Sequence, residues 1–454
     1  MEFFIDYLPV FMFASLTLLL FSGFPVAFIL GGIGLIFWLI SVALGIENDH
    51  SFFLVVGRIY GGVVSNLVLI AIPMFIFMGT MLERSGVAND LLKSLEYMTR
   101  RLPGGLAISV TLLGVILAAT TGIIGASVVM MTLLAMPVML ERGYDKSLAS
   151  GTIAASGTLG ILIPPSIMLI AMADLLSTSA GTLFLAALIP GLLLAILYLG
   201  YILIVSTLNP SLAPSILDDE TSVDLTLGQL VRSFLPPVLL IAAVLGSIFG
   251  GIATPTEASG VGAVGALILA AFKKRLTLTT LKDVTESAAL TTAMLFALFV
   301  GATAFSYVFA LLGGHDLIID IIEAVGAGSW SILFILMLTV FLLGFFFDWI
   351  EITLIILPVF APIIGSLDFG DHIASRDMTV TWFAILMAVN LQTSFLTPPF
   401  GFALFYMKGS APADVTIRHI YKGIIPFVAL QLLALVALIL WPEIALWLPR
   451  MMLD

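Results

Sequence analysis

Two carboxylates lie within a long apolar stretch of this sequence. Asp348 and Glu351 are three residues apart in 344–352, which reads GFFFDWIEI. Ionisable groups at membrane depth are costly to hold there, so they are candidate functional residues. The Asp348 carboxylate is interpreted either as a cation ligand or as the cap of a helix. Glu351 is a candidate for a side chain that faces a water-filled cavity.

Neutral polar side chains gather in two further places, and a Pro-Pro pair follows each group. Residues 155–166 read ASGTLGILIPPS, and residues 389–400 read VNLQTSFLTPPF. Hydroxyl and amide groups supply oxygen ligands of the hard type that Na⁺ accepts. Alignment of the two Pro-Pro pairs matches Ser156 with Asn390 and Thr158 with Gln392. A single Ser or Thr in such a segment most often serves close helix packing, but two matched clusters favour a binding role.

The elements that must position these residues are membrane helices. A spanning helix needs about 20 apolar residues. Two apolar runs, 105–141 and 330–365, are too long for one span and too short for two. Each has a glycine-bearing interruption, at 120–127 and at 342–353. The sequence therefore predicts two re-entrant helical hairpins, whose broken backbone must be buried in protein or line a wet cavity.

A helix that is interrupted in the membrane exposes unpaired amides at one end and unpaired carbonyls at the other. Amide ends attract anions and carbonyl ends attract cations. We expect the hairpin tips to face unwound stretches at 155–160 and 389–397. This arrangement predicts two cation sites with the substrate between them. No Arg falls at the predicted midplane, so half-helix amides and polar side chains would bind a carboxylate.

The composition excludes most other classes of protein. Of 454 residues, 61% are hydrophobic and only 10% are charged, far fewer than in a soluble enzyme. The absence of Cys excludes disulfides and thiolate metal sites. The chain has no HExxH and no Walker-type motif, and its net charge of −11 disfavours nucleic-acid binding. The N-terminus lacks a basic region, so we expect a first membrane span there rather than a cleaved signal.

The distribution of basic residues sets the orientation. Fourteen Lys and Arg fall on one side of the predicted spans, and three (Arg58, Arg376 and Arg450) fall on the other. The first side is therefore predicted to be cytoplasmic, with both termini outside. The first hairpin then opens to the cytoplasm and the second opens outward. Inverted repeats with helices broken near the midplane are a transporter design.

These features resemble the large membrane (M) subunit of tripartite ATP-independent periplasmic (TRAP) transporters, the DctM-like family. The resemblance covers nearly the whole chain in family order. The matching stretches are GFPVAFILGGIG at 23–34, AIPMFIFMGTMLERSGVANDLL at 71–92, the block 103–191, GGIATPTEASGVGAV at 250–264, GFFFDWIEITLIILPV at 344–359 and the block 389–408.

The resemblance implies an all-α polytopic membrane protein with inverted repeats, two re-entrant hairpins and an elevator-type fold of scaffold and transport domains. The implied parts are N-terminal scaffold helices (1–83), an amphipathic arm (84–102), the first hairpin and transport-domain half (103–207), a linking loop and scaffold helices (208–312), a second arm (313–328), the second hairpin and transport-domain half (329–422) and a C-terminal helix (423–454).

The resemblance also implies a function, partners and a site. Such subunits sit in the bacterial inner (cytoplasmic) membrane with a small four-helix membrane (Q) subunit. A periplasmic substrate-binding (P) protein delivers an organic acid, and Na⁺ is the only coupling ion, with no other cofactor and no transition metal. The implied Na⁺ ligands come from Thr120, Thr121, Gly122, Ser127, Ser156, Gly157 and Thr158, and from Gly344, Asp348, Asn390, Gln392, Thr393 and Thr397. The implied substrate residues are Gly125, Ser127, Thr158, Glu351, Gln392, Pro164 and Pro398.

Two other readings remain open from the residues. One is a self-sufficient Na⁺/carboxylate symporter of related fold, which would need no partner proteins. The other is an intramembrane hydrolase that uses Asp348. Aspartyl chemistry requires a second facing carboxylate, and Asp174, the only other candidate outside the tip, is predicted at a helix end. We therefore expect a transporter subunit and no enzyme.

Overall fold

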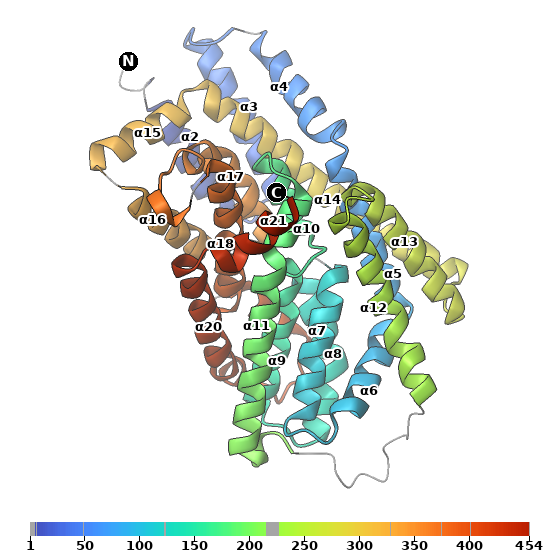
Figure 1. The fold of residues 1–454 in the computed structure, drawn as a ribbon. Coiled ribbons are helices and arrows are strands. Elements are labelled where there is room, and N and C mark those ends of the chain that lie inside the picture. The colour runs from blue at the N-terminus through green and yellow to red at the C-terminus, as the bar shows by residue number, and fades with distance from the viewer. Residues whose placement is uncertain are drawn as a thin grey trace.

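The chain folds into α-helices joined by short loops (Figure 1). The computed structural model describes residues 1–454 except 1–4, 6, 49, 122–123, 215–226, 327, 374, 400 and 454, and the described residues include no β-strand. The helices are α2 (Leu8–Leu20), α3 (Val26–Ala43), α4 (Ser51–Ile59), α5 (Ala71–Arg84), α6 (Val87–Thr99), α7 (Gly105–Thr121), α8 (Ile124–Glu141), α9 (Lys146–Thr158), α10 (Ile167–Leu175), α11 (Ala180–Leu208), α12 (Leu227–Phe249), α13 (Pro255–Phe272), α14 (Leu278–Leu311), α15 (Gly314–Val325), α16 (Ser329–Leu343), α17 (Trp349–Ile364), α18 (Arg376–Leu396), α19 (Phe402–Ser410), α20 (Ile417–Leu440) and α21 (Glu443–Leu453).

Both predicted hairpins are confirmed. The first consists of α7 and α8, and the second consists of α16 and α17, which break within the predicted interruptions. The four helices have 17, 18, 15 and 16 residues. At 1.5 Å per residue, α7, α16 and α17 fall below the length of a spanning helix, whereas α8 is just long and apolar enough to be a candidate span. Each pair of helices still lies within an apolar run that is too short for two full spans, so we expect each tip to lie inside the membrane.

The two halves repeat the same order of elements. A short amphipathic helix (α6 or α15) is followed by a hairpin, a helix broken at a Pro-Pro pair (α9–α10 or α18–α19) and a long helix (α11 or α20). In Figure 1, α6 lies at the lower end of the molecule and α15 lies near the upper end. The halves are thus inverted, as the distribution of basic residues predicts.

The prediction of where the broken helices unwind was wrong. We expected unwound backbone at 155–160 and 389–397, but α9 continues to Thr158 and α18 continues to Leu396. Irregular backbone instead occupies 162–166 and 397–399, around the two Pro-Pro pairs. Proline has no N–H to donate, and it disfavours helical backbone in the residue before it. The prolines therefore set the break, and the polar clusters form the last helical turns before it.

The structure also shows one bend that was not predicted and one predicted boundary that needs correction. The apolar run before α6 belongs to a broken span, because α4 with a π-turn over Tyr60–Val64 meets the segment 68–84 at a bend of 51°. The Asn66 side chain stabilises the bend, since its amide donates to the Gly62 carbonyl and its oxygen accepts from the Val68 amide. The predicted C-terminal helix over 423–454 is two helices, because Pro442 separates α20 from α21.

Burial separates the lipid-facing helices from the central ones. Eight described helices are long and apolar enough to cross a bilayer, or nine if the bent pair counts as one span. In α18, 94% of the apolar window is buried inside the protein, against 17% in α12. The helix that carries Asn390 and Gln392 therefore lies in the centre of the protein, whereas α12 presents most of its surface to the surroundings.

Candidate functional site

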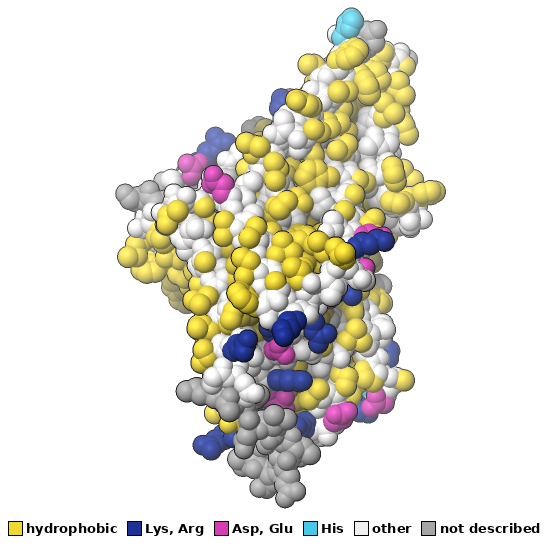
Figure 2. Space-filling view, turned by 90° about the vertical axis from the view of Figure 1, so that its right-hand side faces the viewer, with side chains coloured by type: hydrophobic (Ala, Val, Ile, Leu, Met, Phe, Trp, Pro, Cys, Tyr) yellow, Lys and Arg dark blue, Asp and Glu magenta, His cyan; other side chains and the backbone are white. Residues whose placement is uncertain are grey.

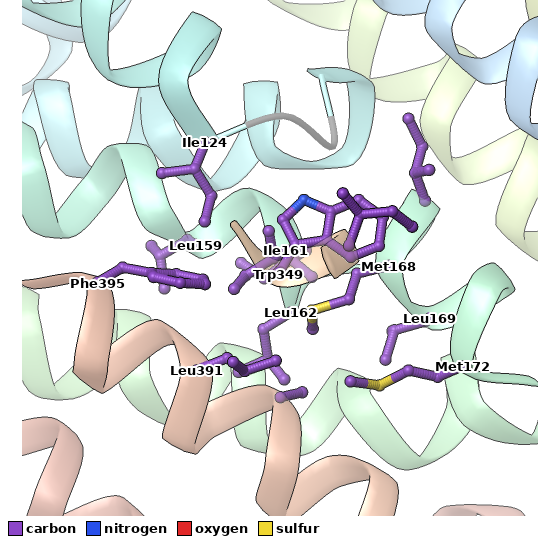
Figure 3. Packing of buried hydrophobic residues seen from close by; sticks show 14 of the residues in the cluster. Ile124, Leu159, Ile161, Leu162, Met168, Leu169, Met172, Trp349, Leu391 and Phe395 are labelled. Atoms are coloured by element: carbon purple, nitrogen blue, oxygen red, sulfur yellow. The ribbon is translucent and has the colours of Figure 1, made fainter. Parts of the chain in front are cut away.

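Both hairpins and both broken helices meet in one apolar cluster. Figure 3 shows the labelled side chains of this cluster, which pack together from five elements and include no charged residue. The cluster joins Ile124 at the start of α8, Trp349 at the start of α17, Leu159 and Ile161 after α9, Met168 in α10 and Leu391 in α18. This packing fixes the hairpin tips against the ends of the broken helices.

The second tip is closed by its own carboxylates. Asp348 is the N-cap of α17 and accepts a hydrogen bond from the Trp349 amide at 2.7 Å. The Glu351 carboxylate accepts from the Asp348 amide at 3.3 Å. This capping box satisfies amides that would otherwise be free at the helix start. Of the two roles considered for Asp348, capping is thus observed.

At the end of α16, amides of the following loop donate hydrogen bonds to the last carbonyls of the helix. The amides of Phe345 and Phe346 donate to the carbonyls of Leu342 and Leu343 at 3.3 and 3.0 Å. The Leu343 carbonyl also accepts from the Phe347 amide at 3.1 Å, so both of its lone pairs are used. The second tip is therefore distinguished by its two carboxylates, whose negative charge favours a cation over an anion.

Gly344 brings this tip into direct contact with α18. A Cβ atom at Gly344 would lie 1.9 Å from the Ser394 Oγ and 2.7 Å from the Ser394 Cβ. Real Cβ atoms do not approach that closely, so any other residue would push the tip away. The glycine at this position allows the hairpin to pack against the polar turn of α18.

The first tip makes a comparable contact with α19. A Cβ atom at Gly125 would lie 2.9 Å from ring carbons of Tyr406. Ser127 is buried two residues further along α8. The backbones of Thr120 and Thr121 end α7, whereas Gly122 lies outside the described residues. α19 packs against both α8 and α18, so it lies between the first tip and the helix that contacts the second tip.

The matched residues Ser156 and Asn390 each form a hydrogen bond between a broken helix and the hairpin of the same repeat. The Ser156 hydroxyl donates to the Thr111 hydroxyl on α7 at 3.2 Å. The Asn390 amide nitrogen donates to the Met337 carbonyl on α16 at 2.7 Å. Both contacts are buried. The two halves thus use the same position of the repeat for the same structural purpose.

The other matched pair, Thr158 and Gln392, meets across the repeat. The Gln392 Nε2 donates to the Thr158 Oγ1 at 3.3 Å. The single hydroxyl proton of Thr158 is donated to the Ala155 carbonyl at 2.9 Å, so this oxygen can only accept from Gln392. The amide nitrogen must therefore face Thr158. This orientation leaves the Gln392 Oε1 buried without a hydrogen-bond partner among the described residues.

A buried acceptor without a partner is costly, and each instance requires an explanation. A free carbonyl-type oxygen next to hydroxyl oxygens is the chemistry of an alkali-metal site. The Thr393 hydroxyl, next to Gln392 in the sequence, donates to the Val389 carbonyl at 2.8 Å, and the Thr397 hydroxyl, five residues after Gln392, donates to the Thr393 carbonyl at 2.7 Å. Because each hydroxyl proton points to the backbone, the oxygen lone pairs remain for a cation.

The remaining predicted residues have structural positions that the sequence did not specify. A Cβ atom at Gly157 would lie 2.7 Å from the Val128 side chain, so Gly157 serves the close approach of α8 to α9. Pro164 is buried at the first break, and Pro398 is partly exposed at the second. Asp174, the second carboxylate considered for a hydrolase, accepts a hydrogen bond from Asn66.

Sequence reasoning did not single out Tyr406, Ser394 or Thr111. Each of them is recognised only through its partner, because the contact joins elements that are distant in the sequence. For Ser394, the signal available was its position in the polar cluster before Pro398. For Tyr406, no local pattern marks the ring that covers Gly125. Among the residues that the structure describes, no group of three His, Cys, Asp or Glu is placed to hold a metal ion.

Comparison with known proteins gives consistent results. Residues 13–444 match the family model described as the DctM component of the tripartite ATP-independent periplasmic transporter. The chain is 31% identical to the C4-dicarboxylate TRAP transporter large permease protein DctM of Pseudomonas aeruginosa, over 84% of this chain and 86% of that protein. It is 29% identical to the isethionate TRAP transporter permease protein DctMQ of Oleidesulfovibrio alaskensis, over 98% of this chain and 66% of that protein. A solved structure, the YdaH transporter of Alcanivorax borkumensis, shares the fold with a TM-score of 0.60 at 15% identity, over 88% of this chain and 89% of that chain.

Proposed function

Because this chain belongs to the DctM family and is the large permease of a TRAP transporter, we propose that it imports a small organic acid together with Na⁺. A periplasmic binding protein delivers the acid, and the permease moves it by an elevator type of alternating access. The protein acts in the bacterial inner membrane. The observation that carries the proposal is the buried Gln392 Oε1, which lacks a partner among the described residues at the crossing point of the two repeats.

In this proposal, the two hairpin tips have different charges and different ligands. The second tip holds Na⁺, because Asp348 and Glu351 provide negative charge and Gln392 provides a free oxygen. Its Na⁺ ligands come from Gly344, Asp348, Asn390, Gln392, Thr393 and Thr397. The first tip contributes a second Na⁺ site through Thr120, Thr121, Gly122, Ser127, Ser156, Gly157 and Thr158.

The substrate carboxylate would lie nearer the first tip. The start of α17 is already occupied by two carboxylates, which would repel an anion. The start of α8 carries only neutral residues, Gly125 and Ser127, and an N-terminal helix end favours an anion. The rest of the substrate would then extend between the tips toward Thr158, Pro164, Glu351, Gln392 and Pro398, with its carboxylate at the end away from Glu351.

The elevator step requires two bodies and flexible connections between them. We propose that the halves 103–207 and 329–422 move as the transport domain, against a scaffold formed by 1–83 and 208–312. The amphipathic helices α6 and α15 precede the hairpins and act as the connecting arms. Their position at opposite ends of the molecule supports this assignment, because the transport domain would be held from both membrane surfaces (Figure 1).

A separate small Q subunit completes the membrane unit in this proposal. The similar DctMQ protein is longer than this chain, which covers only 66% of it. The proposed function is tested by uptake into proteoliposomes that contain this chain, the small subunit and the binding protein, with a panel of small carboxylates. We expect uptake to require an inward Na⁺ gradient. Uptake of equal rate without Na⁺ would overturn the coupling, and uptake without the other proteins would favour the self-sufficient symporter.

A further inference from the structure

A cavity lies between the first arm and the scaffold, away from the hairpin tips. Its volume is about 820 Å³, and three elements line it: α6 with the turn before it, α12, and the end of α13. This is the side on which the short loops carry most of the Lys and Arg residues. Because α6 is the arm, any ligand in the cavity would contact an arm and two scaffold helices at once.

The cavity is strongly positive. Lys93, Arg232, Lys273 and Arg275 line it, together with one carboxylate, that of Asp90. Asp90 forms an ion pair with Lys273 and so compensates only that charge. The side chains of Arg232 and Arg275 have no hydrogen-bond or ion-pair partner among the described residues. Two arginines without partners, with Lys93 beside them, attract an anion with more than one oxygen.

Backbone amides add to the positive electrostatic potential of the cavity. The cavity is also lined by Ser85, Gly86 and Val87, where α6 begins. No side chain caps that helix start. The free amides and the dipole of a helix of 13 residues favour negative charge there.

The wall of the same cavity is apolar where it meets the membrane-facing surface. Pro236, Pro237, Leu269 and Phe272 line it, and the Phe272 side chain is 77% exposed. Figure 2 shows the corresponding face of the molecule, with Lys and Arg side chains gathered at the lower edge of a broad hydrophobic surface. A ligand here would meet basic groups at one end and an apolar surface at the other. A soluble anion would use only the basic end.

We propose that this cavity binds the phosphate headgroup of an anionic phospholipid. The phosphate lies among Arg232, Arg275 and Lys93, and the acyl chains run along the exposed apolar side chains of α12 and α13. Basic pockets between membrane helices on the cytoplasmic side are suited to anionic headgroups. A bound lipid would bridge the arm and the scaffold, so it would hold the hinge of the first arm in place.

The test uses the full chain purified in a neutral detergent. Binding of phosphatidylglycerol and of phosphatidylcholine is measured by native mass spectrometry as a function of lipid concentration. We expect wild type to prefer phosphatidylglycerol, and we expect Arg232→Gln with Arg275→Gln to weaken that binding by roughly tenfold or more. The matched control is Arg418→Gln with Lys422→Gln, which removes two charges from α20 outside the cavity and should leave binding unchanged.

A second measurement does not depend on the folding of a variant. Wild type is photolabelled with a diazirine-bearing phosphatidylglycerol, and the labelled peptides are identified. We expect label in 232–237 and 269–275. Label confined to other segments, equal binding of both lipids, or equal loss in the control variant would each overturn the proposal. Displacement of the lipid by inorganic phosphate at equal concentration would also overturn it, because the site would then be one for small soluble anions.

Discussion

The amide nitrogen of Gln392 donates a hydrogen bond to the hydroxyl of Thr158 across 234 residues of sequence. These two residues occupy equivalent positions of the two inverted repeats, so the repeats contact each other through the same position. The contact directs the Gln392 Oε1 away from Thr158 and leaves it buried without a partner among the described residues. The proposed cation site depends on this relationship.

Removal of that oxygen should weaken Na⁺ activation. We expect Gln392→Leu to raise the Na⁺ concentration for half-maximal uptake by about tenfold, since an interaction with a charged group is worth roughly 1.5–3 kcal/mol. The matched control is Gln431→Leu, which changes another fully buried glutamine, on α20. Measurement of uptake into proteoliposomes as a function of Na⁺ concentration distinguishes the two variants. An equal shift in both variants would mean that the effect is structural.

Substitutions at Asp348 should separate its charge from its capping role. Asn caps a helix about as well as Asp does, whereas Ala costs roughly 1 kcal/mol at an N-cap. We therefore expect Asp348→Asn to lower Na⁺ affinity with little change in Tm. Asp348→Ala should lower both. If the Asn variant keeps the Na⁺ activation curve of wild type, Asp348 is a cap and not a ligand.

A methyl group at Gly344 should push the second tip off α18. The expected cost of Gly344→Ala is roughly 1–3 kcal/mol of stability, together with loss of uptake. Because the clash is with Ser394, the double variant Gly344→Ala with Ser394→Gly should recover uptake, and Ser394→Gly alone serves as its control. Thermal unfolding and uptake of the three variants check this. Failure of the double variant to recover would place the clash elsewhere.

A crosslink between the scaffold and the transport domain should stop transport. Asn66 and Asp174 are hydrogen-bonded, and they lie in the proposed scaffold and the first transport half. The chain has no native Cys, so Asn66→Cys with Asp174→Cys can be joined by a short thiol crosslinker without background. We expect loss of uptake that a cleavable linker restores.

The control for this experiment joins two residues within the transport domain. Lys146 and Asp414 form a salt bridge at 2.8 Å between the two transport halves, so a crosslink between cysteines at these positions should leave uptake intact. Unchanged uptake with the Asn66–Asp174 positions joined would contradict the elevator motion.

Local sequence patterns were enough to predict the membrane class, the two hairpins and the inverted repeat. These features follow from hydrophobic run length, from glycine interruptions and from the distribution of Lys and Arg, all of which act within one segment or one loop. The Pro-Pro pairs should also have located the breaks. The predicted breaks were instead placed at the polar clusters, several residues before the prolines. A helix can contain buried Asn, Gln and Thr without unwinding, so these residues did not mark the breaks.

Only the tertiary structure decided which groups face each other. The sequence identified Asp348, Thr158 and Gln392 as candidates, but it could not show that Asp348 caps α17 or that Gln392 keeps a free oxygen. It gave no sign that Tyr406 covers Gly125. The physical reason is that such contacts depend on the rotation and packing of helices that are far apart in the chain. Composition and spacing determine where a helix begins and ends, whereas close packing determines what its side chains contact.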